Sequence, residues 1–276
     1  MDTLREYRAG IDIGSTTVKL VVLDENDRIL YGQYKRHMAR TQATLAELLA
    51  EAREQIGACK LRARITGSGA INLAKSLEIV FMQEVVAVAT ALKHEAPQTD
   101  VAIELGGEDA KIIYFNGGSI EERMNGICAG GTGSFIDQMA ALLQTDAEGL
   151  NRAAEDYREI YPIAARCGVF AKTDIQPLIN EGARMEDLAA SIFQAVVNQT
   201  ISGLACGKPI RGCVAFLGGP LHFMPELKKA FIRTLKLTPE TIVDPENSHL
   251  FAAMGAALKA ADDTGVEIDL LVKKLS

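Results

Sequence analysis

The segment that decides the fold lies near the N-terminus and reads Asp12-Ile13-Gly14-Ser15-Thr16-Thr17-Val18-Lys19. An apolar strand predicted over residues 9–13 ends in a carboxylate, turns through glycine and three hydroxyl residues, and continues into a second strand at 18–23. Glycine lets backbone amides approach a phosphate, hydroxyls donate hydrogen bonds, and a carboxylate can hold the waters around Mg²⁺. The segment predicts a polyphosphate-binding turn. An ordinary hairpin with a polar turn is the alternative.

A second segment repeats this order and reads Glu104-Leu105-Gly106-Gly107-Glu108-Asp109-Ala110-Lys111. Strands predicted at 101–105 and 110–115 flank its turn, and a third glycine pair, Gly218-Gly219, follows an apolar strand at 214–217. The likeness between the first two segments indicates duplication of one lobe. Neither a Walker A sequence nor a dinucleotide-binding glycine fingerprint occurs at a strand-to-helix junction, so these other nucleotide folds are disfavoured.

The rest of the chain alternates between strand and helix signals. A further strand at 29–34 completes an antiparallel meander with the first two, and residues 61–66 form another strand that Gly67 and Gly69 end. Apolar residues at helical spacing predict helices at 44–56, 84–93, 135–143, 185–204 and 250–261. The short apolar run at 268–272 is predicted to pack as an extra strand or helix.

Composition sets limits on size and partners. The 276 residues, 48% of them hydrophobic, are enough for one large or two medium lobes with apolar cores. A formal net charge of −7 lacks the basic excess that phosphate-backbone binding requires, so no nucleic acid partner is expected. No continuous apolar run approaches the roughly 18 residues of a membrane span, and the first eight residues are too polar for a signal peptide. We therefore expect no membrane association and a cytoplasmic location.

Five cysteines are scattered along the chain: Cys59, Cys128, Cys167, Cys206 and Cys213. This odd number does not predict a disulfide framework. Cys128 and Cys167 each lie in a run of small residues before a predicted helix, where the helix dipole favours the thiolate form that binds metals. Spacing alone, however, favours two buried and inert cysteines. The four histidines, at 37, 94, 222 and 249, lack metal-ligand spacing and are predicted to have surface or capping roles.

Taken together, these segments resemble the activators, or archerases, of 2-hydroxyacyl-CoA dehydratases. These belong to the BadF/BadG/BcrA/BcrD ATPase family of the actin, Hsp70 and sugar kinase superfamily. The likeness runs from Ala9 to Ala261 and includes the Cys-Ala-Gly-Gly-Thr-Gly run that starts at Cys128 and the Cys-Gly-Val-Phe-Ala run that starts at Cys167. It implies an α/β fold: a duplicated actin-like ATPase (ribonuclease H-like) fold with two lobes around a nucleotide cleft. Lobe I would comprise residues 1–95 and 250–276, and lobe II residues 96–249.

The same resemblance assigns roles at the nucleotide site. The implied catalytic carboxylates are Asp12, Glu104, Glu108 and Asp109, and Asp12 would also hold Mg²⁺ through water. The implied cofactor-binding residues are Gly14, Ser15, Thr16, Thr17, Lys19, Gly106, Gly107, Lys111, Gly131, Gly133, Gly218 and Gly219. Glu104 departs from the aspartate that is usual in the family, and the choice between Glu108 and Asp109 for orienting the attacking water stays open.

The resemblance also implies cofactors and partners. Besides ATP or ADP and Mg²⁺, it implies one 4Fe-4S cluster per homodimer, bound by Cys128 and Cys167 of both subunits. Such a cluster usually takes four thiolates, which a two-fold axis supplies from two cysteines per chain. The reduced, oxygen-sensitive dimer would pass an electron from ferredoxin or flavodoxin to an acyl-CoA dehydratase or related reductase. The alternatives are an actin-fold small-molecule or sugar kinase without a cluster, and a nucleotide-sensing regulator that carries no electrons.

Overall fold

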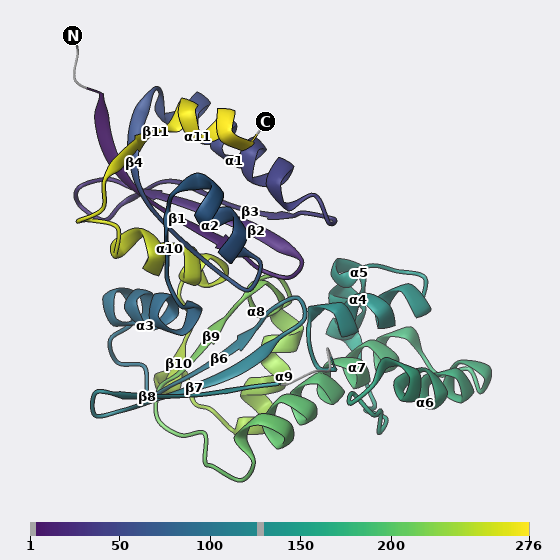
Figure 1. The fold of residues 1–276 in the computed structure, drawn as a ribbon. Helices are drawn as coiled ribbons and strands as arrows, with labels where there is room; N and C mark the ends of the chain where they lie inside the picture. The colour runs from purple at the N-terminus through teal and green to yellow at the C-terminus, as the bar shows by residue number, and fades with distance from the viewer. Residues whose placement is uncertain (1–3, 126–129, 276) are drawn as a thin grey trace. The chain divides into compact units, whose positions relative to one another are not determined.

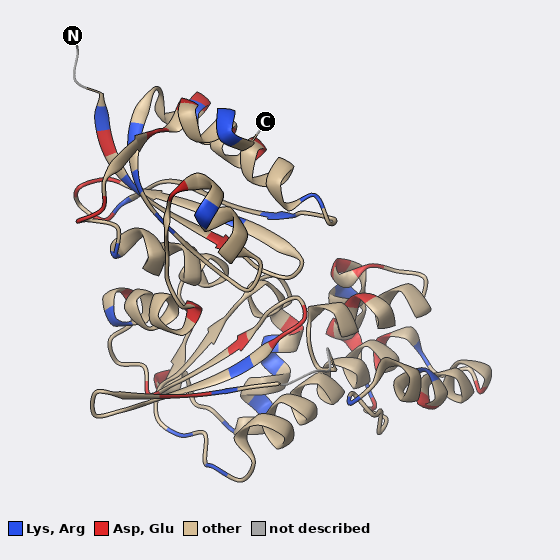
Figure 2. Ribbon diagram, in the orientation of Figure 1, with Lys and Arg blue, Asp and Glu red and all other residues tan. Residues whose placement is uncertain are grey.

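The structure is a computed structural model and describes residues 4–125 and 130–275. The chain divides into two compact units. Unit 1 comprises Met1–Pro97 and His249–Ser276, and unit 2 comprises Gln98–Ser248. In each unit, acidic and basic residues are interspersed along the helices and strands (Figure 2).

Unit 1 contains a mixed sheet with the strand order β11-β4-β1-β2-β3, and β5 pairs with β4. Its strands are β1 (Arg5–Ile13), β2 (Thr17–Leu23), β3 (Ile29–Arg36), β4 (Cys59–Thr66), β5 (Val80–Phe81) and β11 (Gly265–Glu267). The first three strands form the predicted antiparallel meander, and β4 runs parallel to β1. This arrangement brings the ends of β1 and β4 together beside the first glycine-containing turn.

Helices cover both faces of this sheet (Figure 1). They are α1 (Thr41–Ile56), α2 (Ala70–Leu77), α3 (Glu84–Glu95), α10 (Phe251–Leu258) and α11 (Ile268–Leu275). Helix α10 packs against β1, β2 and β4 and also against α3, while α1 packs against β2, β3 and α11. Ile11, Val22 and Leu48 are fully buried in the resulting core, so the strands that carry the first turn are held on both sides.

Unit 2 contains a second sheet with the order β10-β9-β6-β7-β8. Its strands are β6 (Val101–Leu105), β7 (Ala110–Asn116), β8 (Ser119–Met124), β9 (Val214–Leu217) and β10 (Ile242–Val243). Its helices are α4 (Gly133–Leu142), α5 (Ala147–Ala153), α6 (Gly168–Asn180), α7 (Met185–Thr200), α8 (Gly219–Phe223) and α9 (Pro225–Leu235). A large core that includes Phe135, Phe193, Phe216 and Phe231 joins these helices to the sheet.

The two sheets share one topology. In each, three successive strands form an antiparallel meander, and a later strand returns parallel to the first of them: β4 beside β1, and β9 beside β6. The duplication that the repeated segments predict is therefore confirmed at the level of strand order and register.

Most predicted elements are confirmed, with shifted ends. The tail at 268–272 is a helix, α11, and the helix predicted at 250–261 ends earlier, at Leu258. The helix predicted at 185–204 is α7 followed by a π-helical turn at Ile201–Ala205. By length and mean hydropathy this stretch could cross a membrane, but 67% of its most apolar window is buried in unit 2, as expected for a core helix.

Candidate functional site

The first glycine-containing turn joins β1 to β2. The Gly14 amide donates to the Thr17 carbonyl at 2.9 Å, which closes a tight turn. Asp12 and Lys19 lie directly opposite each other in the antiparallel register. The structure thus brings the carboxylate, the turn and the lysine of the predicted phosphate segment into one compact hairpin.

Asp12 and the half-buried Lys19 form an ion pair, with Lys19 Nζ 2.5 Å from Asp12 Oδ2. Asp12 is only 1% exposed. Burial alone would lower the pKa of the Lys19 ammonium, but the charge and hydrogen bond of Asp12 outweigh it, and the pKa lies above its ordinary value. Lys19 therefore stays charged, as its predicted role beside phosphate requires.

His37, which directly follows β3, contacts the same turn. Its backbone amide donates to the Thr16 carbonyl at 3.1 Å, and its Nε2 lies 3.2 Å from the Gly14 carbonyl. Because its Nδ1 accepts from the Ala39 amide, Nε2 is the protonated nitrogen and donates. Of the two predicted roles, a surface position is wrong for His37, which is only 8% exposed, whereas its ring caps backbone groups of Gly14 and Ala39. Nothing local in the sequence indicates this contact between residues more than 20 positions apart.

The second glycine-containing turn joins β6 to β7 and repeats the geometry of the first. The Gly106 amide donates to the Asp109 carbonyl at 2.8 Å, and Glu104 lies opposite Lys111 in the register. The ion pairing differs, because Lys111 Nζ lies 2.8 Å from Asp109 Oδ2 and 3.9 Å from Glu104 Oε2. Glu108 and Asp109 supply the carboxylates of this turn.

The start of α4 is bonded to the second turn. The amides of Gly133 and Ser134 donate to the carbonyls of Gly106 and Gly107 at 3.0 and 2.7 Å. A side chain at Gly133 would place its Cβ 3.1 Å from the Gly106 oxygen, so glycine permits this approach. The segment after Cys128 is therefore in direct contact with the predicted phosphate turn.

Gly218 and Gly219 follow β9 and meet the same region of unit 2. Gly218 has a φ of +89°, and a Cβ there would lie 2.1 Å from the Leu105 carbonyl oxygen. Only glycine fits a left-handed position this close to another backbone. Gly133 also lies near Pro220, with 3.4 Å between its virtual Cβ and the proline Cγ. Unit 2 thus gathers three predicted binding segments around the ends of β6 and β9.

Cys167 is the N-cap of α6 and is half-buried with a free thiol. Its flanking residues contact the segment at Gly130, where a Cβ would lie 2.5 and 2.6 Å from the carbonyl oxygens of Ala165 and Arg166. Gly131 lies against α7, because its virtual Cβ is 3.1 Å from Gln199 Cγ. Cys128 itself lies outside the described residues.

The other cysteines show no ligand arrangement. Cys59 is buried, and burial raises the pKa of its thiol to about 11, which disfavours the thiolate. Cys206 is exposed and Cys213 is half-buried. Within residues 4–125 and 130–275, no group of three or more histidine, cysteine or acidic side chains is placed to hold a metal ion.

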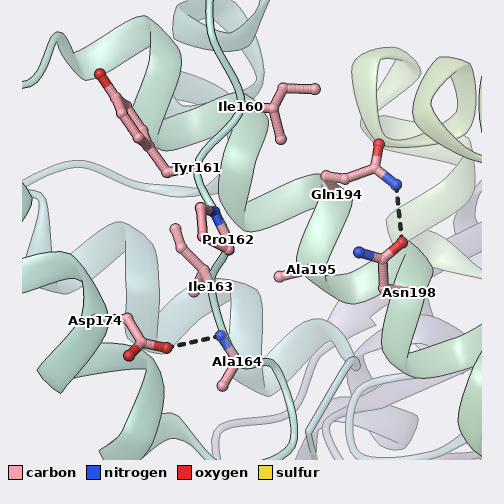
Figure 3. Close-up of a pocket in the computed structure, with 9 residues that line it drawn as sticks. All are labelled: Ile160, Tyr161, Pro162, Ile163, Ala164, Asp174, Gln194, Ala195 and Asn198. Carbon is pink, nitrogen blue, oxygen red and sulfur yellow. Dashed lines mark hydrogen bonds between the residues drawn. The ribbon is translucent and has the colours of Figure 1, made fainter.

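A hollow of about 550 Å³ lies beside the segment that leads to Cys167 (Figure 3). Ile160, Pro162 and Ile163 line it together with Gln194 and Asn198 of α7. The Asp174 carboxylate accepts a hydrogen bond from the Ala164 amide at 2.9 Å, which ties this segment to α6. No residue of the glycine-containing turns lines this hollow, so it is no part of the predicted nucleotide site.

Residues 9–260 match the BadF/BadG/BcrA/BcrD ATPase family, and the chain belongs to that family. Among its relatives, the 2-hydroxyisocaproyl-CoA dehydratase activator of Clostridioides difficile is 29% identical over 266 residues, covering 93% of this chain and 96% of the relative. The fold is that of the actin-like ATPases.

Two solved structures resemble the chain over nearly its whole length. The activator of the 2-hydroxyisocaproyl-CoA dehydratase from Clostridium difficile with bound ADPNP has a TM-score of 0.82 and 25% identity, and covers 97% of this chain and 96% of its own. The (R)-2-hydroxyglutaryl-CoA dehydratase component A of Acidaminococcus fermentans has a TM-score of 0.80 and 26% identity, and covers 93% of this chain and 99% of its own.

Proposed function

We propose that this chain is an ATP-hydrolysing activator that reduces an acyl-CoA dehydratase or a related reductase. It would work as a homodimer, with one 4Fe-4S cluster held by Cys128 and Cys167 of both copies. The family match over residues 9–260 and the dehydratase activators among the relatives support the ATP-dependent part of this role. The contacts between the predicted phosphate turn and the cysteine-bearing segments support a coupling of ATP hydrolysis to electron transfer.

At the nucleotide end, the two glycine-containing turns would bind the phosphates, and Gly218 and Gly219 would lie under the adenosine. Asp12 would hold the waters of Mg²⁺, a role that fits a carboxylate whose Oδ1 is buried and has no hydrogen-bond partner among the described residues. Glu108 or Asp109 would orient the attacking water, since positioning and electrostatics supply most of the rate in phosphoryl transfer.

The observation that carries the proposal is a short path of contacts inside unit 2. The Gly133 and Ser134 amides hold the Gly106 and Gly107 carbonyls, and the backbone at Gly130 touches the carbonyls just before Cys167. A change in the second turn on nucleotide binding would therefore pull on the segments that carry both cysteines. Because interiors are close-packed, such a shift would move α4 and α6 rather than be absorbed locally.

The cysteine end fits a shared cluster in its donor chemistry. Cys167 offers a free thiol at a helix N-terminus, and the sequence supplies Cys128 just before Gly130. Val169 and Phe170, which follow Cys167, are 68% and 64% exposed. These apolar side chains offer a surface that a second copy would cover. When bound, the cluster would supply one-electron chemistry at low potential.

The partner would be the dehydratase or reductase that binds the acyl-CoA, and ferredoxin or flavodoxin would reduce the activator. The named relatives serve 2-hydroxyisocaproyl-CoA, lactoyl-CoA and (R)-2-hydroxyglutaryl-CoA dehydratases. The acyl group is therefore a property of the partner, whereas ATP hydrolysis and electron delivery are the properties proposed for this chain.

Anaerobic purification followed by iron and sulfide assays and an absorption spectrum tests the proposal. We expect about four irons per dimer. Cys128→Ala and Cys167→Ala should each lose the iron and the visible absorption. Cys206→Ala is the matched control, because this exposed thiol corresponds to no family ligand and should leave the iron content unchanged.

Protein that stays free of iron after anaerobic reconstitution would contradict the electron-transfer role. If such protein also transferred phosphate from ATP to a sugar or small acid, the kinase alternative would replace the proposal. Slow ATP hydrolysis without phosphate transfer or any redox signal would instead indicate a nucleotide-sensing regulator.

A further inference from the structure

The turn after β4, with the sequence Thr66-Gly67-Ser68-Gly69, packs against the first glycine-containing turn. Asp12 and Thr66 are partners in the parallel register of β1 and β4. The Gly69 amide donates to the Ile13 carbonyl at 3.0 Å. Gly67 has a φ of +98°, and a Cβ there would lie 2.3 Å from the Ile13 oxygen and 2.5 Å from Asp12 Oδ1. This turn thus wraps the residues that begin the phosphate segment.

Two buried oxygens in this place have no hydrogen-bond partner in the described part of the chain: Asp12 Oδ1 and Thr66 Oγ1. Asp12 is 1% exposed and Thr66 0%. Lys19 already occupies the other carboxylate oxygen, Oδ2. Buried polar atoms in native proteins are almost always satisfied, and an unpaired one often marks a bound water or ion. Two such atoms on paired residues therefore point to a ligand between them.

The second turn lacks the hydroxyl on the parallel strand. There the residue beside Glu104 in the parallel register is Leu217, which has no polar side-chain atom. Both turns have a glycine after the parallel strand, Gly67 in unit 1 and Gly218 in unit 2, so the duplication keeps the backbone and changes the side chain. The hydroxyl is thus specific to the turn whose carboxylate we assign to the metal.

We propose that Thr66 is a positioning residue for the nucleotide's divalent cation, holding with Asp12 Oδ1 one water that is a ligand of that cation. The inference rests on the proposed function, since it requires nucleotide and metal at the first turn. A hydroxyl suits the task because its oxygen can accept a hydrogen bond from one proton of the metal-bound water, while Asp12 Oδ1 accepts the other. Mg²⁺ suits it as well, because it keeps several waters when bound through one or two carboxylates.

The test compares the affinity for the non-hydrolysable analogue ADPNP with and without Mg²⁺, measured by titration calorimetry. The dissociation constant without Mg²⁺ divided by the constant with Mg²⁺ gives a ratio that reports the coupling between metal and nucleotide. Thr66→Val keeps the side-chain shape and removes the hydroxyl. We expect it to reduce the ratio by about 10-fold or more, the usual effect of losing a residue that orients a metal ligand. The affinity in EDTA should stay within about twofold of the wild type.

Two variants serve as controls. Thr66→Ser retains a hydroxyl and should retain the wild-type ratio. Thr44→Val makes the same chemical change at a buried threonine of α1 in the same unit and should leave the ratio unchanged. Should Thr66→Val fail to fold, Thr66→Ala replaces it in the same comparison.

An unchanged ratio in Thr66→Val overturns the inference. If the affinity also falls equally with and without Mg²⁺, the threonine has a purely structural role. In either case the wild type would still bind ADPNP and the proposed function would stand. Wild-type protein that fails to bind ADPNP would contradict the proposed function itself, before any variant is measured.

Discussion

The two glycine-containing turns share one backbone and differ in how they pair their charges. In the first, the buried Asp12 carboxylate lies 2.5 Å from Lys19 across the hairpin, and the lysine side chain is 13% exposed. In the second, the corresponding glutamate lies 3.9 Å from Lys111, which bonds instead to Asp109 in the turn at 2.8 Å. The two arrangements differ because Glu104 is one methylene longer than Asp12 and because the second turn offers Asp109 as a nearer partner for its lysine.

On the proposed function, we expect this difference to divide the roles of the two turns. The first turn carries hydroxyls and a pre-formed ion pair, which suits the binding of phosphate and metal. The second turn carries two acids and receives the amides of α4, which suits the positioning of water and the transmission of a change toward Cys167. Substitutions of charged residues at matched positions in the two units should therefore have different effects.

The largest expected effect is on ATP hydrolysis. Asp12→Asn removes the charge that we assign to the metal, and we expect kcat to fall by about 10²- to 10³-fold, the usual loss for a group that stabilises developing charge. Glu104→Gln, its counterpart, should lower kcat by only about 10-fold, because the lysine opposite it has Asp109 as its nearer partner. Steady-state phosphate release measures both. Equal losses would show that the two strand carboxylates have equivalent roles.

The ion pairs should also differ in their contribution to folding. Asp12→Ala leaves the Lys19 ammonium buried without an anion, which typically costs about 3 kcal/mol of unfolding free energy. Asp109→Ala should cost about 1 kcal/mol or less, because the Asp109 side chain is 37% exposed and Glu104 still lies 3.9 Å from the buried Lys111 ammonium. Urea denaturation gives both values. The double variant Asp12→Ala/Lys19→Met should be more stable than Asp12→Ala alone. A lower unfolding free energy in the double variant would contradict the expectation that the unpaired Lys19 charge destabilises Asp12→Ala.

The glycines behind the two turns should behave alike. Gly67→Ala and Gly218→Ala each place a Cβ under 2.4 Å from a carbonyl oxygen at a positive φ, and we expect a loss of about 2 to 3 kcal/mol for each. Gly117 is the matched control, because its φ is +54° but nothing lies within 4 Å of its Cβ. Gly117→Ala should cost only about 1 kcal/mol. Thermal unfolding of the three variants makes the comparison, and a tolerated Gly218→Ala would contradict the close approach to Leu105.

The smallest expected effect is a pH dependence of opposite sign in the two units. Hydrogen bonds that the protonated His94 ring donates to Glu95 and to Asp27 raise the pKa of His94 in unit 1, so its stabilisation is complete below about pH 6.5 and is lost as the pH rises through the raised value. Burial lowers the pKa of His222 in unit 2, so its contribution is present above about pH 6.5 and is lost as the pH falls.

Urea midpoints of the wild type, His94→Gln and His222→Gln between pH 5.5 and about 8 check this expectation. The His94 effect should be only a few tenths of a kcal/mol, because its side chain is 40% exposed and solvent screens its partners. Differences of the same sign for both variants would contradict the assigned environments.

Sequence reasoning found the strands and helices whose patterns are local and strong. The β-branched run in β2 and the helical spacing in α1 and α7 predicted those elements correctly. It missed α2, which begins directly after the glycines of the turn at 66–69, and the small strands β5, β10 and β11, which exist only through pairing with neighbours. It also extended α10 beyond Leu258, because alanine-rich sequence continues past the last helical turn.

The features of the candidate site likewise include some that the sequence predicted and some that it did not. The order of carboxylate, glycine, hydroxyl and lysine within eight residues was enough to predict a phosphate-binding turn. The contacts of His37 with Gly14, and of Thr66 with Asp12, could not be predicted, since each joins residues more than 20 positions apart. Gly67 and Gly69 were visible in the sequence only as the end of a strand.

The sequence by itself determined the chemistry of each turn and the repeat that makes two turns of one kind, because hydrogen-bonding capacity, charge and glycine's conformational freedom are properties of neighbouring residues. Only the tertiary structure decided which lysine meets which carboxylate, which hydroxyl lies beside Asp12, and which amides reach the second turn. Those choices depend on strand register and on the close packing of segments that the chain brings together from distant positions.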